Sequence, residues 1–128
     1  MNEIKIIKEY FNFLLENKFL CKHAKDNLEH SVFYTKYPLE IAITFDVRES
    51  KIFVGLLDLS AEKPYFTYTL LEEANIASIN KIKTLNDAIN DIYCEGNINK
   101  HKLKSLLSLY ADFIKENLDT IFHWKYFH

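Results

Sequence analysis

The chain has 128 residues, a formal net charge of −2 at pH 7 and 48% hydrophobic residues. This length predicts one globular domain over residues 1–128. The slight negative charge argues against binding of nucleic acid through a bulk positive field. The two cysteines lie far apart, so neither a disulfide framework nor a structural zinc site is implied. No apolar stretch is long enough to cross a membrane. We therefore expect a cytoplasmic protein that needs no cofactor or metal.

The first half of the chain predicts one helix followed by strands. Apolar residues at helical spacing indicate an amphipathic helix from about residue 2 to 17, and a short strand is expected over residues 19–23. Residues 32–37 are β-branched and aromatic, and residues 39–48 alternate strictly between apolar and polar side chains. The second of these strands should therefore bury one face and expose the other to solvent.

Two further strands are predicted before the pattern changes. Residues 52–59 are almost continuously apolar, which indicates a central strand buried on both faces. Residues 65–71 alternate aromatic residues with threonines, which predicts another strand. The strands would form a three- to four-stranded antiparallel meander.

The second half of the chain predicts helices. Residues 74–83 fit either a short helix or an irregular connection. Thr84 is expected to cap a helix that stops at Gly96, and Asn99 to cap a longer helix whose apolar face runs to Phe122. The fold class is therefore α+β, with an N-terminal helix, the meander, and two or three C-terminal helices packed on one sheet face.

No set of residues matches a known catalytic pattern. Cys21, His23 and His30 are close in sequence, and a thiolate paired with histidine could act as a nucleophile or join a metal shell. Their spacing fits no established motif, so a partly buried cysteine and two surface histidines are the favoured interpretation. The two glycines lie in no phosphate-binding loop. We expect a protein that is not an enzyme.

Two segments near the C-terminus have both a functional and a structural interpretation. Lys100, Lys102 and Lys104 occupy the first turns of the last predicted helix, where the helix dipole disfavours cations. They could bind an anion or simply be solvated. The tail over residues 122–128 is rich in aromatic residues and could bind a partner or stack on bases, although closing the core beside the last helix is favoured.

The predicted sheet region has the opposite charge. Residues 31–75 contain seven acidic residues against four basic ones. Acidic residues next to tyrosines suit recognition of a basic protein, because charge steers the encounter and tyrosine supplies contact area. An ordinary solvated sheet edge is the alternative. The candidate partner-binding residues are Glu40, Asp46, Glu49, Glu62, Tyr65 and Tyr68.

The order of elements, with the strand LEIAITFDVR at residues 39–48 and the helix SLYADFIKENL at residues 108–118, resembles small single-domain immunity proteins. These belong to bacterial contact-dependent growth inhibition and polymorphic toxin systems. The resemblance implies a protein that binds and neutralises one cognate toxin domain, often a nuclease, with one-to-one stoichiometry. The acidic rim would then contact a basic, nuclease-like partner.

An alternative hypothesis comes from another class of function. A small accessory or regulatory domain would bind nucleic acid or an anionic ligand through the Lys100–Lys104 region and the aromatic tail. Affinity for an oligonucleotide that falls steeply with salt would distinguish it from a toxin inhibitor. The sequence leaves the oligomeric state open.

Overall fold

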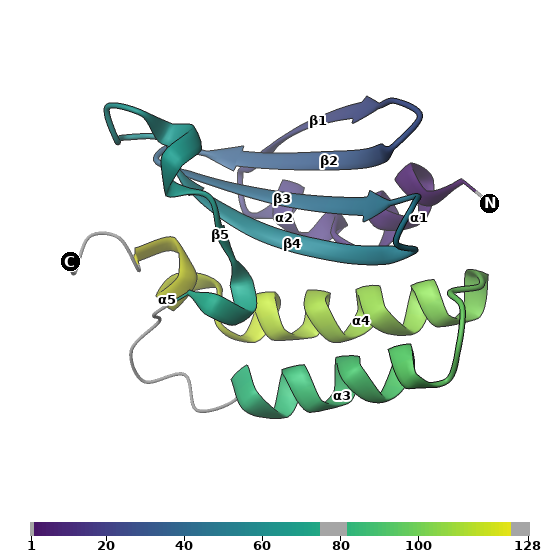
Figure 1. Cartoon of the computed structure of the whole chain (residues 1–128). Helices are drawn as coiled ribbons and strands as arrows, with labels where there is room; N and C mark the ends of the chain where they lie inside the picture. The colour runs from purple at the N-terminus through teal and green to yellow at the C-terminus, as the bar shows by residue number, and fades with distance from the viewer. Residues whose placement is uncertain (1, 75–81, 124–128) are drawn as a thin grey trace. The chain divides into compact units, whose positions relative to one another are not determined.

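The computed structural model describes residues 2–74 and 82–123 (Figure 1). The fold is α+β, as predicted: N-terminal helices come first, an antiparallel sheet follows, and helices complete the chain. The chain divides into two compact units, Met1–Leu71 and Glu72–His128, and each is described here by itself.

Two short helices begin the first unit. They are α1 (Glu3–Tyr10) and α2 (Asn12–Glu16), so the predicted single helix is interrupted at Phe11. The Asn2 side chain caps α1 by accepting a hydrogen bond from the backbone N–H of Lys5 at 3.2 Å. Phe11 is fully buried, and its ring centroid lies 6.1 Å from that of Tyr34. The break therefore falls at a residue that packs on the sheet.

The sheet is a five-stranded antiparallel meander in which sequence order equals spatial order. The sequence predicted three or four strands, so the sheet has one or two strands more than expected. Its strands are β1 (Leu20–Lys25), β2 (Glu29–Lys36), β3 (Leu39–Asp46), β4 (Lys51–Asp58) and β5 (Thr69–Leu70).

The two faces of the sheet have different surroundings. Helices α1 and α2 lie behind the strands in Figure 1 and cover one face. On that face His30 Nδ1 lies 3.0 Å from Glu3 Oε2, and the side chains of Ile41 and Ile43 are fully buried. The alternate residues of each strand point to the opposite side, which we call the open face.

One of the predictions about the last two predicted strands was wrong in detail. Residues 65–71 do not form one strand: a 3₁₀ turn η1 (Pro64–Thr67), the two-residue β5 and a second 3₁₀ turn η2 (Leu71–Glu73) replace it. The Thr67 hydroxyl donates to the Pro64 carbonyl and accepts from the Asp58 N–H, which stabilises the turn. Strand β4 lies inside the sheet between β3 and β5, and most of its residues are buried on both faces, as predicted for residues 52–59.

The second unit contains α3 (Ile82–Cys94), α4 (Lys100–Glu116) and α5 (Leu118–His123). The Asn99 cap is confirmed, since its side chain accepts from the Lys102 N–H at 2.8 Å, and Gly96 follows α3 with φ of 111°. Thr84 is not a cap, because it lies inside α3. The long predicted helix breaks at Asn117, whose N–H bonds to the carbonyls of the preceding turn.

Most of the ambiguous segment 74–83 and the tail beyond residue 123 lie outside the described residues. Within the described parts of the chain, no helix is long and apolar enough to cross a membrane.

Candidate functional site

A groove of about 450 Å³ lies on the open face of the sheet. All of its lining residues belong to the first unit and come from β2, β3, β4 and the segment that follows β4. They are Glu29, Ser31, Phe33, Glu40, Ala42, Thr44, Asp46, Phe53, Leu57, Tyr65, Tyr68 and Leu70.

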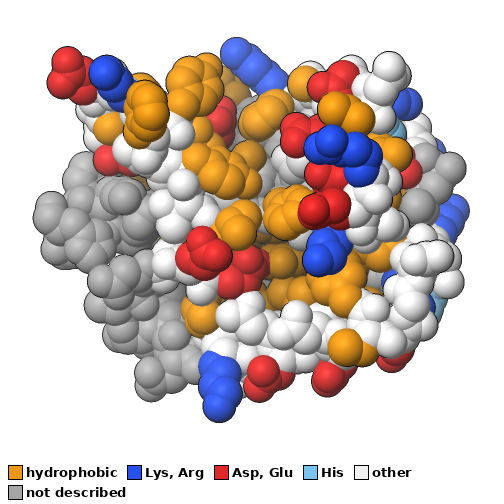
Figure 2. Space-filling view, viewed as in Figure 1, with side chains coloured by type: hydrophobic (Ala, Val, Ile, Leu, Met, Phe, Trp, Pro, Cys, Tyr) orange, Lys and Arg blue, Asp and Glu red, His pale blue; other side chains and the backbone are white. Residues whose placement is uncertain are grey.

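Small side chains make the floor of this groove. On the open face, strand pairing places Ser31 of β2 beside Thr44 of β3, and Ala42 of β3 beside Gly55 of β4. We call residues paired across the strands a row. These two neighbouring rows have small side chains in the middle of the sheet. The Ser31 and Thr44 hydroxyls are hydrogen-bonded at 2.8 Å, which satisfies both groups within the floor. Seen from the side away from α1 and α2, hydrophobic side chains over the strands stand next to acidic ones (Figure 2).

Tyr68 forms part of the wall, and Gly55 makes this possible. A Cβ atom built on Gly55 would overlap the ring of Tyr68, including its hydroxyl end. Only glycine therefore lets the ring lie directly on β4. This contact fixes the segment after η1 against the open face and raises one side of the groove.

The charged residues that line the groove are all acidic. They are Glu29, Glu40 and Asp46, and none of the described residues lining it is lysine, arginine or histidine. Asp46 is only 8% exposed, and its Oδ1 accepts the Glu49 N–H at 2.9 Å, so it stabilises the β3–β4 turn. Glu40 is more accessible, and Thr35 Oγ1 donates to its Oε1 at 3.2 Å.

The structure brings together four of the six residues predicted to bind a partner. Glu40, Asp46, Tyr65 and Tyr68 line the one groove. Glu49 lies in the turn after β3 and Glu62 in the segment before η1, both outside the lining.

The sequence prediction missed the groove's phenylalanines and its floor. Phe33 and Phe53 reach the open face because β2 and β4 pair with β3 in a register that places Phe33 opposite Ala42 and Phe53 opposite Thr44. The alternation of residues 39–48 was the available signal, since it already marked Ala42 and Thr44 as facing away from the core.

Two aromatic side chains of η1 are strongly exposed beside the groove. Tyr65 is 87% and Phe66 85% exposed, although both are large and mostly apolar. Lys63 Nζ lies 5.7 Å from the Phe66 ring centroid, a cation–π contact. Exposed aromatic residues that adjoin a hollow are typical of surfaces that bind other proteins.

Cys21, His23 and His30 each have a separate contact. The buried Tyr34 hydroxyl is hydrogen-bonded to Cys21, and burial, followed by the Cys21 contact, raises the pKa of Tyr34. Lys8 Nζ lies 2.9 Å from His23 Nδ1, while His30 is paired with Glu3 and is less exposed than predicted. Among the described residues, no three His, Cys, Asp or Glu side chains form a group able to hold a metal ion.

The lysine cluster at the start of α4 has a partly structural role. Lys102 Nζ donates to the Glu95 carbonyl at 2.7 Å, which caps the C-terminal end of α3. Lys100 is exposed, and Lys104 is partly buried. Binding of an anion or nucleic acid at these lysines stays a prediction, and the tail that would assist it lies beyond the described residues.

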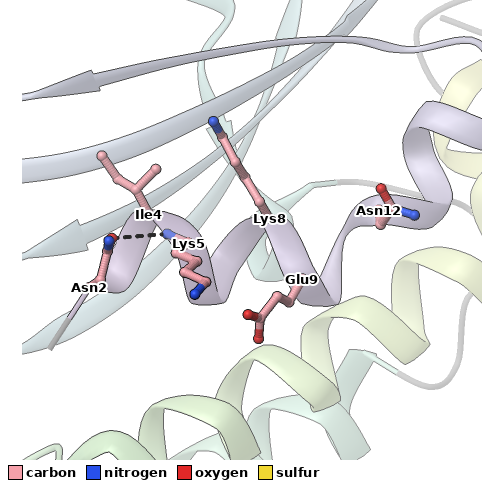
Figure 3. A pocket seen from close by; sticks show the side chains of 6 residues that line it. All are labelled: Asn2, Ile4, Lys5, Lys8, Glu9 and Asn12. Carbon is pink, nitrogen blue, oxygen red and sulfur yellow. Dashed lines mark hydrogen bonds between the residues drawn. The ribbon is translucent and has the colours of Figure 1, made fainter.

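A second hollow follows the exposed side of α1. Its lining comes from α1 and from the flanking residues Asn2 and Asn12, the latter in α2. Ile4 and Lys8 project on one side while Lys5 and Glu9 project on the other (Figure 3). Lys8 is engaged with His23, and the hollow mixes both signs of charge. The open-face groove is therefore the better candidate site, because several strands build it and its charge has one sign.

Comparison of the chain with family models, curated proteins and solved structures finds no match in any of the three.

Proposed function

We propose that this protein is an inhibitor that binds a basic protein domain through the open face of its sheet. The groove supports the proposal most directly, because it combines carboxylates and aromatic side chains and has no basic residue among its described lining. A positively charged partner would be steered towards such a surface, and the aromatic residues would supply buried contact area.

The proposed partner is a toxin domain, in keeping with the resemblance to bacterial immunity proteins. The inhibitor would act in the cytoplasm by stoichiometric binding and would catalyse no reaction. Glu40, Tyr65 and Tyr68 would make the central contacts, while Glu49 and Glu62 would extend the acidic surface on either side. Asp46 would contribute charge, although its carboxylate already stabilises a turn.

Affinity capture with the tagged full chain tests this proposal. We expect the wild-type protein to retain one protein in near-equal amount from the cells that carry its gene. Glu40→Lys should lose most of that protein, mainly through slower association. Asp91→Lys makes the same change in net charge at an exposed position of α3 and should behave like the wild type.

Inhibition needs its own measurement. The captured protein, or its C-terminal domain, is expressed alone and with the inhibitor. We expect expression alone to stop growth and co-expression with the wild type, but not with Glu40→Lys, to restore it. Equal retention by Glu40→Lys and the wild type would remove the groove from the proposal. A captured domain that is unaffected by the wild type would show that the protein is not its inhibitor.

A further inference from the structure

The end of the groove around Glu40 differs from the end around Asp46. On the open face, Asp46 of β3 is paired with Lys51 of β4, so a lysine already lies next to this acidic residue. Glu40 lies between Thr35 and Leu57, and this row continues to Leu20 on β1. No basic residue occupies the Glu40 row, so its carboxylate is the better one to receive a cation from outside.

The carboxylate of Glu40 is held in place by its neighbour. Thr35 Oγ1 donates to Glu40 Oε1 at 3.2 Å from the adjacent strand. A carboxylate that is already oriented loses less side-chain entropy when it binds a ligand. This end of the groove is therefore partly organised before a partner arrives.

Two aromatic rings line the same groove as this carboxylate. The Tyr68 ring covers Gly55, which is the next open-face position of β4 after Leu57, the residue opposite Glu40. Tyr65 lines the same groove from η1 and is largely exposed. One carboxylate and two phenol rings thus line the same hollow. We call Glu40, Tyr65 and Tyr68 the notch.

We infer that the notch binds a single arginine side chain of the partner. The planar guanidinium group donates two parallel N–H bonds to a carboxylate and also stacks on aromatic faces, so it matches both parts of the notch. A lysine ammonium group is a compact point charge without this planar fork. The inference rests on the proposed function and names the group of the basic partner that the groove recognises.

Titration of the isotope-labelled full chain with short peptides, followed by amide NMR shifts, tests this inference. The probes are acetyl-Ala-Arg-Ala-amide and the same peptide with lysine in place of arginine. We expect the arginine peptide to shift the amides of Thr35, Glu40 and Tyr68 and to bind more tightly than the lysine peptide. Glu40→Gln should weaken arginine binding roughly tenfold or more, as expected for loss of a charged hydrogen bond. Tyr65→Ala should weaken it roughly two- to fivefold, the range for an exposed cation–π contact.

The matched control is Glu16→Gln, which removes one negative charge from an exposed residue of α2 outside the groove. It should leave arginine binding unchanged, and the spectrum of each variant reports whether the fold is intact. Equal binding of the two peptides, or shifts confined to residues outside the notch, would overturn the inference. So would the absence of any shift. The capture experiment tests the proposed function separately. If the captured protein is inhibited by the wild type and is no longer retained by Glu40→Lys, the proposed function stands even when the arginine peptide does not bind.

Discussion

At the scale of single residues, the contact between Gly55 and Tyr68 is the one that shapes the groove. A methyl group at position 55 would overlap the Tyr68 ring. We expect Gly55→Ala to lower the free energy of unfolding by about 1 kcal/mol, the low end of the cost of overpacking, because the partly exposed Tyr68 ring can move away. In the background of Tyr68→Ala the same substitution should cost much less, because the ring is absent. A double-mutant cycle of urea denaturation measures this coupling. Additive effects would contradict the proposed contact.

A second residue-scale prediction concerns the pair that joins α1 to β2. The His30 ring contacts the Glu3 carboxylate, and both side chains are almost buried. His30→Ala leaves that carboxylate without this partner, so we expect the free energy of unfolding to fall by about 1–3 kcal/mol. His30→Gln, which keeps a donor, should recover part of the loss. His101→Ala, at an exposed position of α4, is the control and should change little. Chemical denaturation of the four proteins gives the comparison.

At the scale of elements, the start of α4 depends on one side chain. Asn99 accepts a hydrogen bond from the Lys102 N–H, whereas the basic residues of the first turn oppose the helix dipole. Asn99→Ala should therefore cost about 0.5–2 kcal/mol of stability. Asn97→Ala removes an exposed asparagine from the same connection and should cost much less. Thermal unfolding followed by circular dichroism would show the difference, and equal losses would mean that the cap contributes little.

The elements also show what the sequence could predict. Strict alternation placed Glu40 and Asp46 on the same face of a strand, because the two-residue period of a strand is a local property. The prediction that this face is exposed to solvent was wrong in part, since Ala42 and Asp46 are buried. Asn99 at the start of α4 and Gly96 after the end of α3 were predicted correctly, because helix capping also depends on local sequence. Thr84 was wrong, since a good capping residue does not by itself start a helix.

Other features depend on interactions that no local pattern contains. Phe33 and Phe53 join the groove only through strand register, which pairs segments that are distant in sequence. The alternation of residues 65–71 predicted a strand, yet the Thr67 hydroxyl bonds to Pro64 and Asp58 and favours a 3₁₀ turn. The contact between Tyr68 and Gly55 therefore could not be predicted from either residue alone.

At the scale of the whole molecule, Glu72 makes stability depend on pH. Burial raises the pKa of Glu72, the nearby Glu73 adds to this, and the hydrogen bond with Tyr110 opposes it only in part. Within the described chain, its Oε1 atom is buried without a hydrogen-bond partner. A raised pKa in the folded state means that the unfolded chain ionises first. The protonated Glu72 side chain therefore contributes its full stabilisation below pH 4.5, the ordinary pKa of glutamate. This stabilisation is lost as the pH rises through the higher pKa that Glu72 has in the folded protein.

Replacement of this carboxyl group tests the pH dependence. Glu72→Gln cannot ionise, so its stability relative to the wild type should increase as pH rises from 4.5 towards neutrality. Glu73→Gln is the matched control, because Glu73 is exposed, and it should follow the wild type more closely. Urea denaturation at a series of pH values measures the three curves. A constant difference between Glu72→Gln and the wild type would show that Glu72 does not titrate with folding.

The order of strands in the sheet also bears on how the groove comes into being. Each strand pairs with the strand that follows it in the chain, so every pairing closes a short loop and loses little conformational entropy. All residues that line the groove precede Leu71. During synthesis, the strands of the groove can therefore pair while α3 and α4 have not yet been made, because the surface proposed to meet the partner precedes both helices in the chain.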